Sequence, residues 1–550
     1  MYKKTAVEDP QKRFEFAMPF GGEMNPDNRW VRKRDLFPWT YIEELYEETL
    51  SGSDKGCAAI AASVAFGAIY IQEFFGITDR ETVAQIQENP YLQYFIGYQS
   101  YRPEEPFDHS QMVTFRKRFS KEILDKINRR IAAEALGLMS EGSVTQEDEK
   151  GSEEDENSGD GGSSGERGTP GERQDSDEPI EDTRTFEEKA AENNGQLIVD
   201  ATCIPADIPY PTDVNLLNES REKSEEIIDQ LHAPHKGILK RPRTYRQRAR
   251  REYIVFSKQR KPSRKKIRKA IKKQLGYLKR NLAAIKDMVE TREPGLSLLS
   301  KRHYKLLLVI NEVYRQQRYM YDKNIHKVDH RIVNIYQPHV RPIVRGKAGT
   351  PTEFGPKISI SLQEGLSFVD RLNWEAYNES GDLPEQIERY KQRHGCYPES
   401  VHADKLYRTR ENRKCCRDRG IRLSGPKLGR PPKETEENKE YLSRLKQQQQ
   451  QDERDRQAVE GKFGQGKRRF RLDHIMTKLA VTSETTIMMA FIIMNIEKIC
   501  KDLLFVLFLS WNSLASGVWN ALKRLLRREK CWVKLLGGLH VRSQALPVAA

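Results

Sequence analysis

The sequence has few cysteines, and none of the seven forms a C-x-x-C pair. That pattern argues against a disulfide framework and against the common zinc-ligand spacings, and it indicates a reducing compartment. The N-terminal residues also lack the apolar segment that marks a secretory signal peptide. We therefore expect a cytoplasmic protein.

Long hydrophobic runs are scarce as well. The most apolar stretch near the C-terminus, residues 503–522, is interrupted by Asn512, Ser513, Gly517 and Asn520. A membrane-spanning helix needs about 20 predominantly apolar residues, so this stretch is a poor candidate and no membrane partner is expected. A partner-binding or core helix is the favoured interpretation. A helix lying on a membrane surface is the alternative, because basic residues follow the stretch.

Positive charge is abundant, and the net charge of the 550-residue chain is +14. Residues 236–280 contain twenty Lys or Arg and one acid, Glu252, with Tyr245, Tyr253 and Phe256 interleaved. Such a segment indicates salt-dependent binding to a phosphate backbone, with a solvated helix face as the alternative. The DNA-contacting residues expected within it are Arg264, Lys265, Lys266, Arg268 and Lys269.

Negative charge collects in a different place. Residues 141–185 hold sixteen acids and four bases, a net charge of −12, with glycine and serine at the centre. A segment of this composition cannot bury a core and is expected to be a disordered linker.

Three carboxylates stand out by their setting. Asp200 and Asp404 each end a short apolar run of strand length, and Glu460 lies in an otherwise basic stretch between Arg456 and Lys467. An acid at a strand end is either a cap or a metal ligand, and a solvated amphipathic helix would also explain the stretch around Glu460. Offsets of four and seven put Arg456 and Lys467 on nearly the same helix face as Glu460. Three glycines, at positions 461, 464 and 466, predict that this helix frays or turns.

The stretch from Arg456 to Lys467 resembles the R-x3-E-x6-K part of the signature of DDE transposases from bacterial insertion sequences, in the insertion-sequence-5-like and insertion-sequence-4-like superfamily. The tyrosine that opens the family signature is replaced by Glu453. Residues 205–217 resemble the segment after the first catalytic aspartate of that group, and residues 403–407 resemble its second-aspartate motif. Residues 107–119 resemble part of its N-terminal helical domain.

The resemblance implies a specific chemistry. Asp200, Asp404 and Glu460 would be the catalytic residues and would hold two Mg²⁺ or Mn²⁺ ions, which prefer oxygen ligands. The expected activity is metal-dependent cleavage and strand transfer of an insertion sequence, and the alternatives are a nuclease of the same fold without strand transfer and a non-enzymatic nucleic-acid-binding protein. The expected partner is DNA, at the transposon ends and at the target site. Further copies of the chain are also expected, in a homodimer or higher oligomer, and the protein would be nucleoid-associated. The DNA contacts near Glu460 would come from Arg456, Lys467, Arg468 and Arg469.

The expected fold is an α/β ribonuclease-H-like catalytic domain with a basic helical insertion, preceded by an all-α domain for DNA-end binding or dimerisation. Within the catalytic domain the pattern predicts two strands, a helix, a strand ending in Asp404, a helix, a strand, and a helix carrying Glu460. Residues 426–451 are expected to be a mobile arm, and residues 487–494 a helix that seals the sheet. The predicted boundaries are 1–29 polar arm, 30–138 helical domain, 139–190 acidic disordered linker, 191–235 first part of the catalytic domain, 236–340 basic helical insertion, 341–500 rest of the catalytic domain, and 501–550 C-terminal helix and tail.

Overall fold

The structure, a computed structural model, divides into two units, residues 1–494 and residues 495–550. Most of the predicted acidic linker and of the C-terminal tail lies outside the described residues, as does the apolar stretch from residue 506 onward. The part of the chain that the structure describes consists of residues 11, 13–50, 58–137, 185–291, 295–345, 352–426, 428–430, 432–433, 435 and 437–505.

The N-terminal part is helical, as expected. Its aromatic core explains why short helices hold together here: the ring of Phe37 lies 5.1 to 5.8 Å from the rings of Trp39, Phe66, Tyr70 and Phe95. Edge-on contacts of this kind add to the burial of the rings themselves. The helices are α1 (Arg29–Arg34), α2 (Trp39–Glu47), α3 (Ala62–Phe75), α4 (Asp79–Glu88), α5 (Pro90–Phe95), α6 (Gln111–Arg118) and α7 (Lys121–Ala135).

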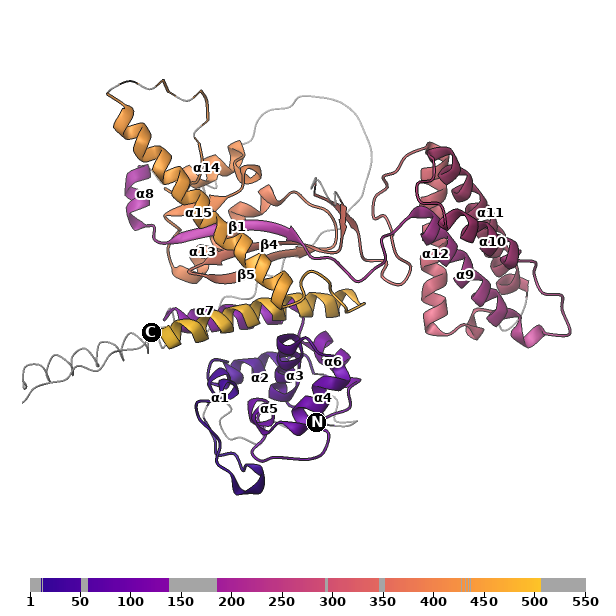
Figure 1. The fold of residues 1–550 in the computed structure, drawn as a ribbon, viewed down its shortest axis with the longest axis horizontal. Helices are drawn as coiled ribbons and strands as arrows, with labels where there is room; N and C mark the ends of the chain where they lie inside the picture. Colours follow the sequence, from indigo (N-terminus) through magenta and orange to yellow (C-terminus); the bar gives the residue numbers. More distant parts are fainter. Residues whose placement is uncertain are drawn as a thin grey trace, which may run out of the picture. The chain divides into compact units, whose positions relative to one another are not determined.

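A five-stranded mixed sheet follows, in the order β5-β4-β1-β6-β7 (Figure 1). Its central strand, β1, is buried from Leu197 to Val199. It pairs antiparallel with β4 on one side and parallel with β6 on the other. A separate two-stranded hairpin is made by β2 (Pro342–Val344) and β3 (Thr352–Phe354). The sheet strands are β1 (Gln196–Cys203), β4 (Lys357–Gln363), β5 (Leu366–Asn373), β6 (Ser400–Ala403) and β7 (Arg422–Leu423).

The helices of the sheet region follow the predicted succession. α13 (Leu383–His394) lies between β5 and β6, and α14 (Arg410–Asp418) lies between β6 and β7. A short helix that the sequence analysis assigned largely to the linker, α8 (Phe186–Glu192), precedes β1 and begins with a capping box at Thr185 and Glu188.

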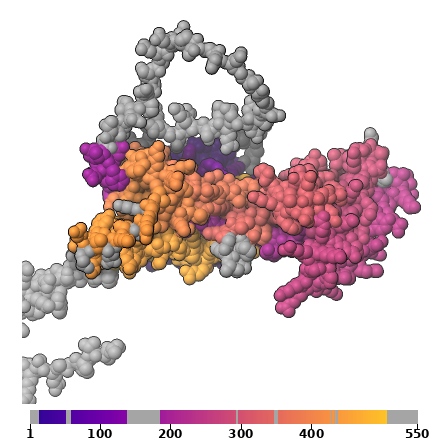
Figure 2. Space-filling view, turned by 90° about the horizontal axis from the view of Figure 1, so that it is seen from above, coloured from indigo at the N-terminus to yellow at the C-terminus, as the bar shows by residue number. Residues whose placement is uncertain are grey.

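The region of the expected basic helical insertion forms part of a four-helix bundle, which appears in magenta to red in Figures 1 and 2. Its members are α9 (Asp213–His232), α10 (Arg246–Ser257), α11 (Arg264–Thr291) and α12 (Lys301–Lys323). Leu216, Leu217, Ile227, Ile228 and Leu231 of α9 belong to the same buried cluster as Leu278 and Ile310. The apolar face of α9, which precedes residue 236, therefore completes the core of the bundle.

The helix that carries Glu460 is longer than expected. α15 runs without interruption from Lys439 to Arg469, through all three glycines and through the second half of the predicted mobile arm. The expectation of a turn at these glycines was wrong: glycine's low helix propensity costs only about 1 kcal/mol per residue, which packing can override. At Gly466 a side chain would meet Leu472, so the close approach itself favours glycine there.

The next helix, residues 480–505, is buried throughout residues 487–494. It contacts both preceding parts of the first unit. Thr485 donates to the carbonyl oxygen of Arg116 at 2.7 Å, and Thr486 donates to the carboxylate of Glu73 at 2.9 Å. Glu484 accepts a hydrogen bond from the indole of Trp374, just beyond β5, at 2.8 Å. Among the described residues, no helix is long and apolar enough to span a membrane.

Candidate active site

Asp404 directly follows β6, as expected, but Asp200 does not end its strand: β1 continues to Cys203, and Asp200 is paired with Ile360 of β4. Val199 pairs with Ala403 in the parallel register of β1 and β6, and Asp200 and Asp404 are the next residues along. The two aspartates therefore follow the last pair of this parallel register, on adjacent strands. The Asp200 side chain accepts a hydrogen bond from the amide of Ala201 at 2.8 Å, and that of Asp404 accepts from the amide of Lys405 at 2.7 Å. The side chains are therefore held by their own backbone.

The electrostatics of Asp200 reflect this position. Burial raises the pKa of Asp200 to about 6, and the negative charge of Asp404 acts in the same direction. The amide of Ala201 and the guanidinium groups of Arg456 and Arg345 oppose the rise. A carboxyl group with a raised pKa, close to a second carboxyl and to cations, is a common property of catalytic sites.

Glu460 lies on α15, the helix that contacts β1 and β6, and its partner there is Arg456. Arg456 donates to Glu460 at 2.9 Å and to Glu453 at 3.4 Å, and it also interacts with the charge of Asp404. The side chain of Arg456 is 18% exposed, whereas that of Glu460 is 54% exposed. The structure thus brings Asp200, Asp404 and Arg456 together and holds Glu460 against the arginine. Within the described ranges, no three acidic, histidine or cysteine side chains form a group that could hold a metal ion.

The predicted DNA-contacting residues lie on two helices. Lys467, Arg468 and Arg469 form the last turn of α15. The residues of the basic segment, from Arg264 to Lys269, are in the first turns of α11, where the charged side chains are exposed. Arg268 is held in place by the ring of Tyr321, 4.2 Å away, and by Asn324 at 2.9 Å.

Several residues that touch the site were not singled out from the sequence. Arg345 donates to the hydroxyl of Thr202 at 2.8 Å and to the carbonyl of Ala201 at 3.2 Å, directly beside Asp200. Tyr407 is fully buried, and the charge of Asp200 contributes to raising its pKa. Arg345 and Tyr407 lie far from Asp200 in sequence, so no local pattern could reveal them. Tyr407 does fall in the segment that carries the second-aspartate resemblance.

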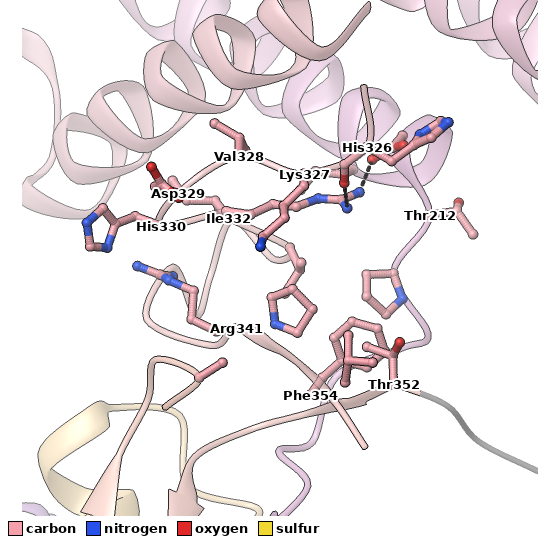
Figure 3. Close-up of a pocket in the computed structure, with 18 of the residues that line it drawn as sticks. Thr212, His326, Lys327, Val328, Asp329, His330, Ile332, Arg341, Thr352 and Phe354 are labelled. Atoms are coloured by element: carbon pink, nitrogen blue, oxygen red, sulfur yellow. Dashed lines mark hydrogen bonds and ion pairs between the residues drawn. The ribbon is translucent and has the colours of Figure 1, made fainter. Parts of the chain in front are cut away.

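A cavity of about 850 Å³ lies between the bundle and the β2–β3 hairpin (Figure 3). The ring of Tyr210, 72% exposed, meets the ring of Phe354 edge-on at 5.5 Å on one side. Lys327 points into the cavity, whereas Arg331 and Arg341 are paired with Asp213 and Glu375, each at 2.7 Å. Neither Asp200 nor Asp404 lines this cavity. Its aromatic and cationic lining is suited to a nucleic-acid strand.

Two family models match the chain. Residues 401–497 match a transposase DDE domain, and residues 20–118 match a transposase domain, DUF772. The first range contains Asp404, Arg456, Glu460 and Lys467, and the second contains α1 to α6. The two matches support a DDE transposase of an insertion element.

The chain also resembles a protein described as uncharacterized, ORF8 in the nfe locus of Rhizobium meliloti, with 30% identity over 104 residues. The similarity covers 19% of the chain and 49% of that protein, so the chain spans about half the length of this relative. No solved structure matches the chain. The first aspartate, Asp200, lies outside both matched ranges, so its assignment depends on the strand pairing described above.

Proposed function

We propose that this transposase cleaves and rejoins DNA strands at the ends of its element, with Asp200, Asp404 and Glu460 as the catalytic carboxylates. The observation that carries the proposal is that Asp200 and Asp404 directly follow the last pair in the parallel register of β1 and β6, close to the helix that presents Arg456 and Glu460. This arrangement of acids on a mixed sheet with a following helix supports a ribonuclease-H-like catalytic domain.

Two of the three proposed ligands are suited to divalent cations. Asp200 and Asp404 offer carboxylate oxygens, the ligands that Mg²⁺ and Mn²⁺ prefer, and their mutual repulsion is the kind that a bound cation relieves. Glu460 would complete the set, and Arg456 is its partner in the structure. When bound, two such ions supply activation of the attacking hydroxyl and stabilisation of the leaving oxygen in an in-line displacement.

The remaining side chains are assigned to binding and orientation. Arg456 would balance the charge of the carboxylates and meet the scissile phosphate, since a guanidinium is well shaped for phosphate oxygens. Lys467, Arg468 and Arg469 would bind the backbone next to it. The exposed bases at the start of α11 would hold a more distant part of the DNA, and the helical domain would bind transposon ends or pair two copies of the chain.

The test uses duplex DNA taken from the flanks of the gene, incubated with Mg²⁺. The parent should nick and join this DNA, and chelation of Mg²⁺ should abolish both activities. Glu460→Gln should bind the DNA as tightly as the parent but neither nick nor join it, since the acid repels DNA and Arg456 and Lys467 remain. Lys467→Ala is the matched control on the same helix: it should weaken binding and retain part of the cleavage.

The outcome also separates the alternatives. Cleavage without joining would indicate a nuclease of the same fold. Metal-independent binding with no cleavage under any condition would indicate a nucleic-acid-binding protein, and parental cleavage by Glu460→Gln would remove Glu460 from the catalytic set and make Glu453 the next candidate.

A further inference from the structure

The packing of α15 follows a strict interval. The buried residues of this helix are Asp452, Val459 and Gly466, seven positions apart. Glu453, Glu460 and Lys467 each come one position later, so they lie on the neighbouring face of the helix. An α-helix turns by about 100° and rises 1.5 Å per residue. A slip of the buried stripe by one position would therefore rotate Glu460 away from the strand ends.

Two of the three buried residues, Val459 and Gly466, determine how closely α15 packs, but they do not determine which residues of the helix face the sheet. Val459 is fully buried, and Gly466 lies where an added Cβ would be 2.9 Å from Leu472 and 3.6 Å from Met494. Small and apolar contacts of this kind are not directional. Several neighbouring residues of α15, among them Ala458 and Gly461, are small enough to occupy similar space.

The third buried position is charged and directional. Asp452 accepts two hydrogen bonds from Arg422 on β7, at 2.7 and 3.0 Å. Its carbonyl oxygen lies 3.4 Å from the ring of His402 on β6, and that ring contacts Ser400 at 3.0 Å. Both strands are thus tied to one residue of α15, and β6 is the strand that ends at Asp404. The Asp452 side chain is 7% exposed and that of Arg422 is 36% exposed.

An ion pair with a buried partner contributes little net stability, because desolvation of that partner offsets the attraction, and its best-attested use is to specify a register. We propose that the Arg422–Asp452 pair sets the register of α15 and so positions Glu460 and Arg456 over Asp200 and Asp404. Arg422 and Asp452 are positioning residues in this account, and neither contacts DNA. The catalytic consequence rests on the proposed function, whereas the structural consequence does not.

The experiment replaces the pair by apolar residues of similar size, Arg422→Met with Asp452→Leu. The position of α15 is read from the distance between spin labels at two exposed residues, Lys414 on α14 and Gln457 on α15, attached through non-natural amino acids. We expect one narrow distance distribution in the parent and a broad or multiple one in the double variant. Thermal unfolding should be unchanged or shifted upward, and DNA binding should be retained. The cleavage rate should fall on the order of a hundredfold, the usual effect of a displacement of about 1 Å.

The matched control is an exposed ion pair on the same helix. Arg444 bonds to Glu440 at 2.6 Å, and both side chains are more than three-quarters exposed. Arg444→Met with Glu440→Leu removes the same charges without touching the sheet, and it should change neither the distance distribution nor cleavage. The charge exchange Arg422→Asp with Asp452→Arg should recover part of the narrow distribution.

A narrow parental distribution in Arg422→Met with Asp452→Leu, together with parental cleavage, would overturn the proposal. If that variant does not fold, Arg422→Lys replaces it, since lysine keeps the charge but cannot make both hydrogen bonds. If Arg422→Lys lowers the unfolding temperature but leaves the distribution of spin-label distances as narrow as in the parent, the Arg422–Asp452 pair contributes only to stability and does not set the register. A parent that never cleaves DNA would refute the proposed function and leave the distance measurement decisive for the register.

Discussion

The raised pKa of Asp200 makes a prediction about stability that does not require activity. Asp200→Asn keeps the shape of the side chain and an oxygen that can accept from the amide of Ala201, but it removes the negative charge. At a pH where Asp200 is ionised, the buried charge destabilises the folded state. Removing that charge should therefore stabilise the protein in the absence of metal.

The size of the effect follows from the shift. Folding raises the pKa of Asp200 from 3.8 to about 6, mainly because the carboxyl group is buried. Each pKa unit corresponds to about 1.36 kcal/mol, so Asp200→Asn should stabilise the folded state by at most about 3 kcal/mol. For an acid with a raised folded pKa, the penalty is absent below the unfolded pKa, grows between 3.8 and about 6, and is constant above that. Asp200→Asn should gain the full amount at pH 7.5 and roughly half of it at pH 5.

The assay is thermal unfolding of parent and variant at the two pH values, with EDTA and then with Mg²⁺. In EDTA the variant should unfold at the higher temperature, with a larger difference at pH 7.5. An ion present at a hundredfold excess over its dissociation constant stabilises the folded state by about 2.7 kcal/mol. Mg²⁺ should therefore raise the unfolding temperature of the parent but not that of Asp200→Asn. Asp473→Asn, at an exposed acid, is the control and should show neither effect. A difference between parent and Asp200→Asn that is the same at both pH values would contradict the reasoning.

Three further outcomes are expected. Glu460→Gln should lower the rate of DNA cleavage by a hundredfold or more without weakening DNA binding, as measured by single-turnover kinetics and a binding titration. Replacing the five bases of α11 by glutamine should weaken binding to all DNA sequences alike and flatten the dependence of log K on log salt; an unchanged slope would mean a merely solvated surface. Those bases are Arg264, Lys265, Lys266, Arg268 and Lys269. Gly466→Ala should lower stability by about 1–3 kcal/mol because its Cβ would press on Leu472, whereas Gly461→Ala, in open space on the same helix, should raise it by up to about 1 kcal/mol.

The sequence carried the information on elements whose signals are local. The strand β6 could be predicted because an apolar run of strand length ends in Asp404. The same pattern located β1 but not its end, because the strand continues past Asp200 to Cys203 in its pairing with β4. The helices α13 and α14 were predicted on either side of β6, each with a glycine after its last turn. The parallel pairing of β1 with β6, with Val199 opposite Ala403, is a long-range contact that the structure supplies.

Long-range contacts could not be predicted in the same way. Arg345 reaches Thr202, and Arg422 reaches Asp452, through contacts between residues that no motif connects. The packing of α9 into the bundle could not be predicted because the helix is rich in charged residues. Only the structure shows which of its faces is apolar and buried. At α15 the propensity of glycine was given too much weight against a stripe of buried positions seven residues apart.

The contacts of the helix at residues 480–505 have a consequence for synthesis. Burial raises the pKa of Glu73, whose carboxylate accepts a hydrogen bond from the hydroxyl of Thr486, more than four hundred residues later in the chain. During synthesis the N-terminal helices therefore leave the ribosome long before Thr485 and Thr486 are made, and only these residues donate the hydrogen bonds described above to Arg116 and Glu73. We expect chains interrupted before residue 480 to keep this surface open and to be removed by proteases, so that prematurely terminated products would not accumulate as competitors of the complete protein.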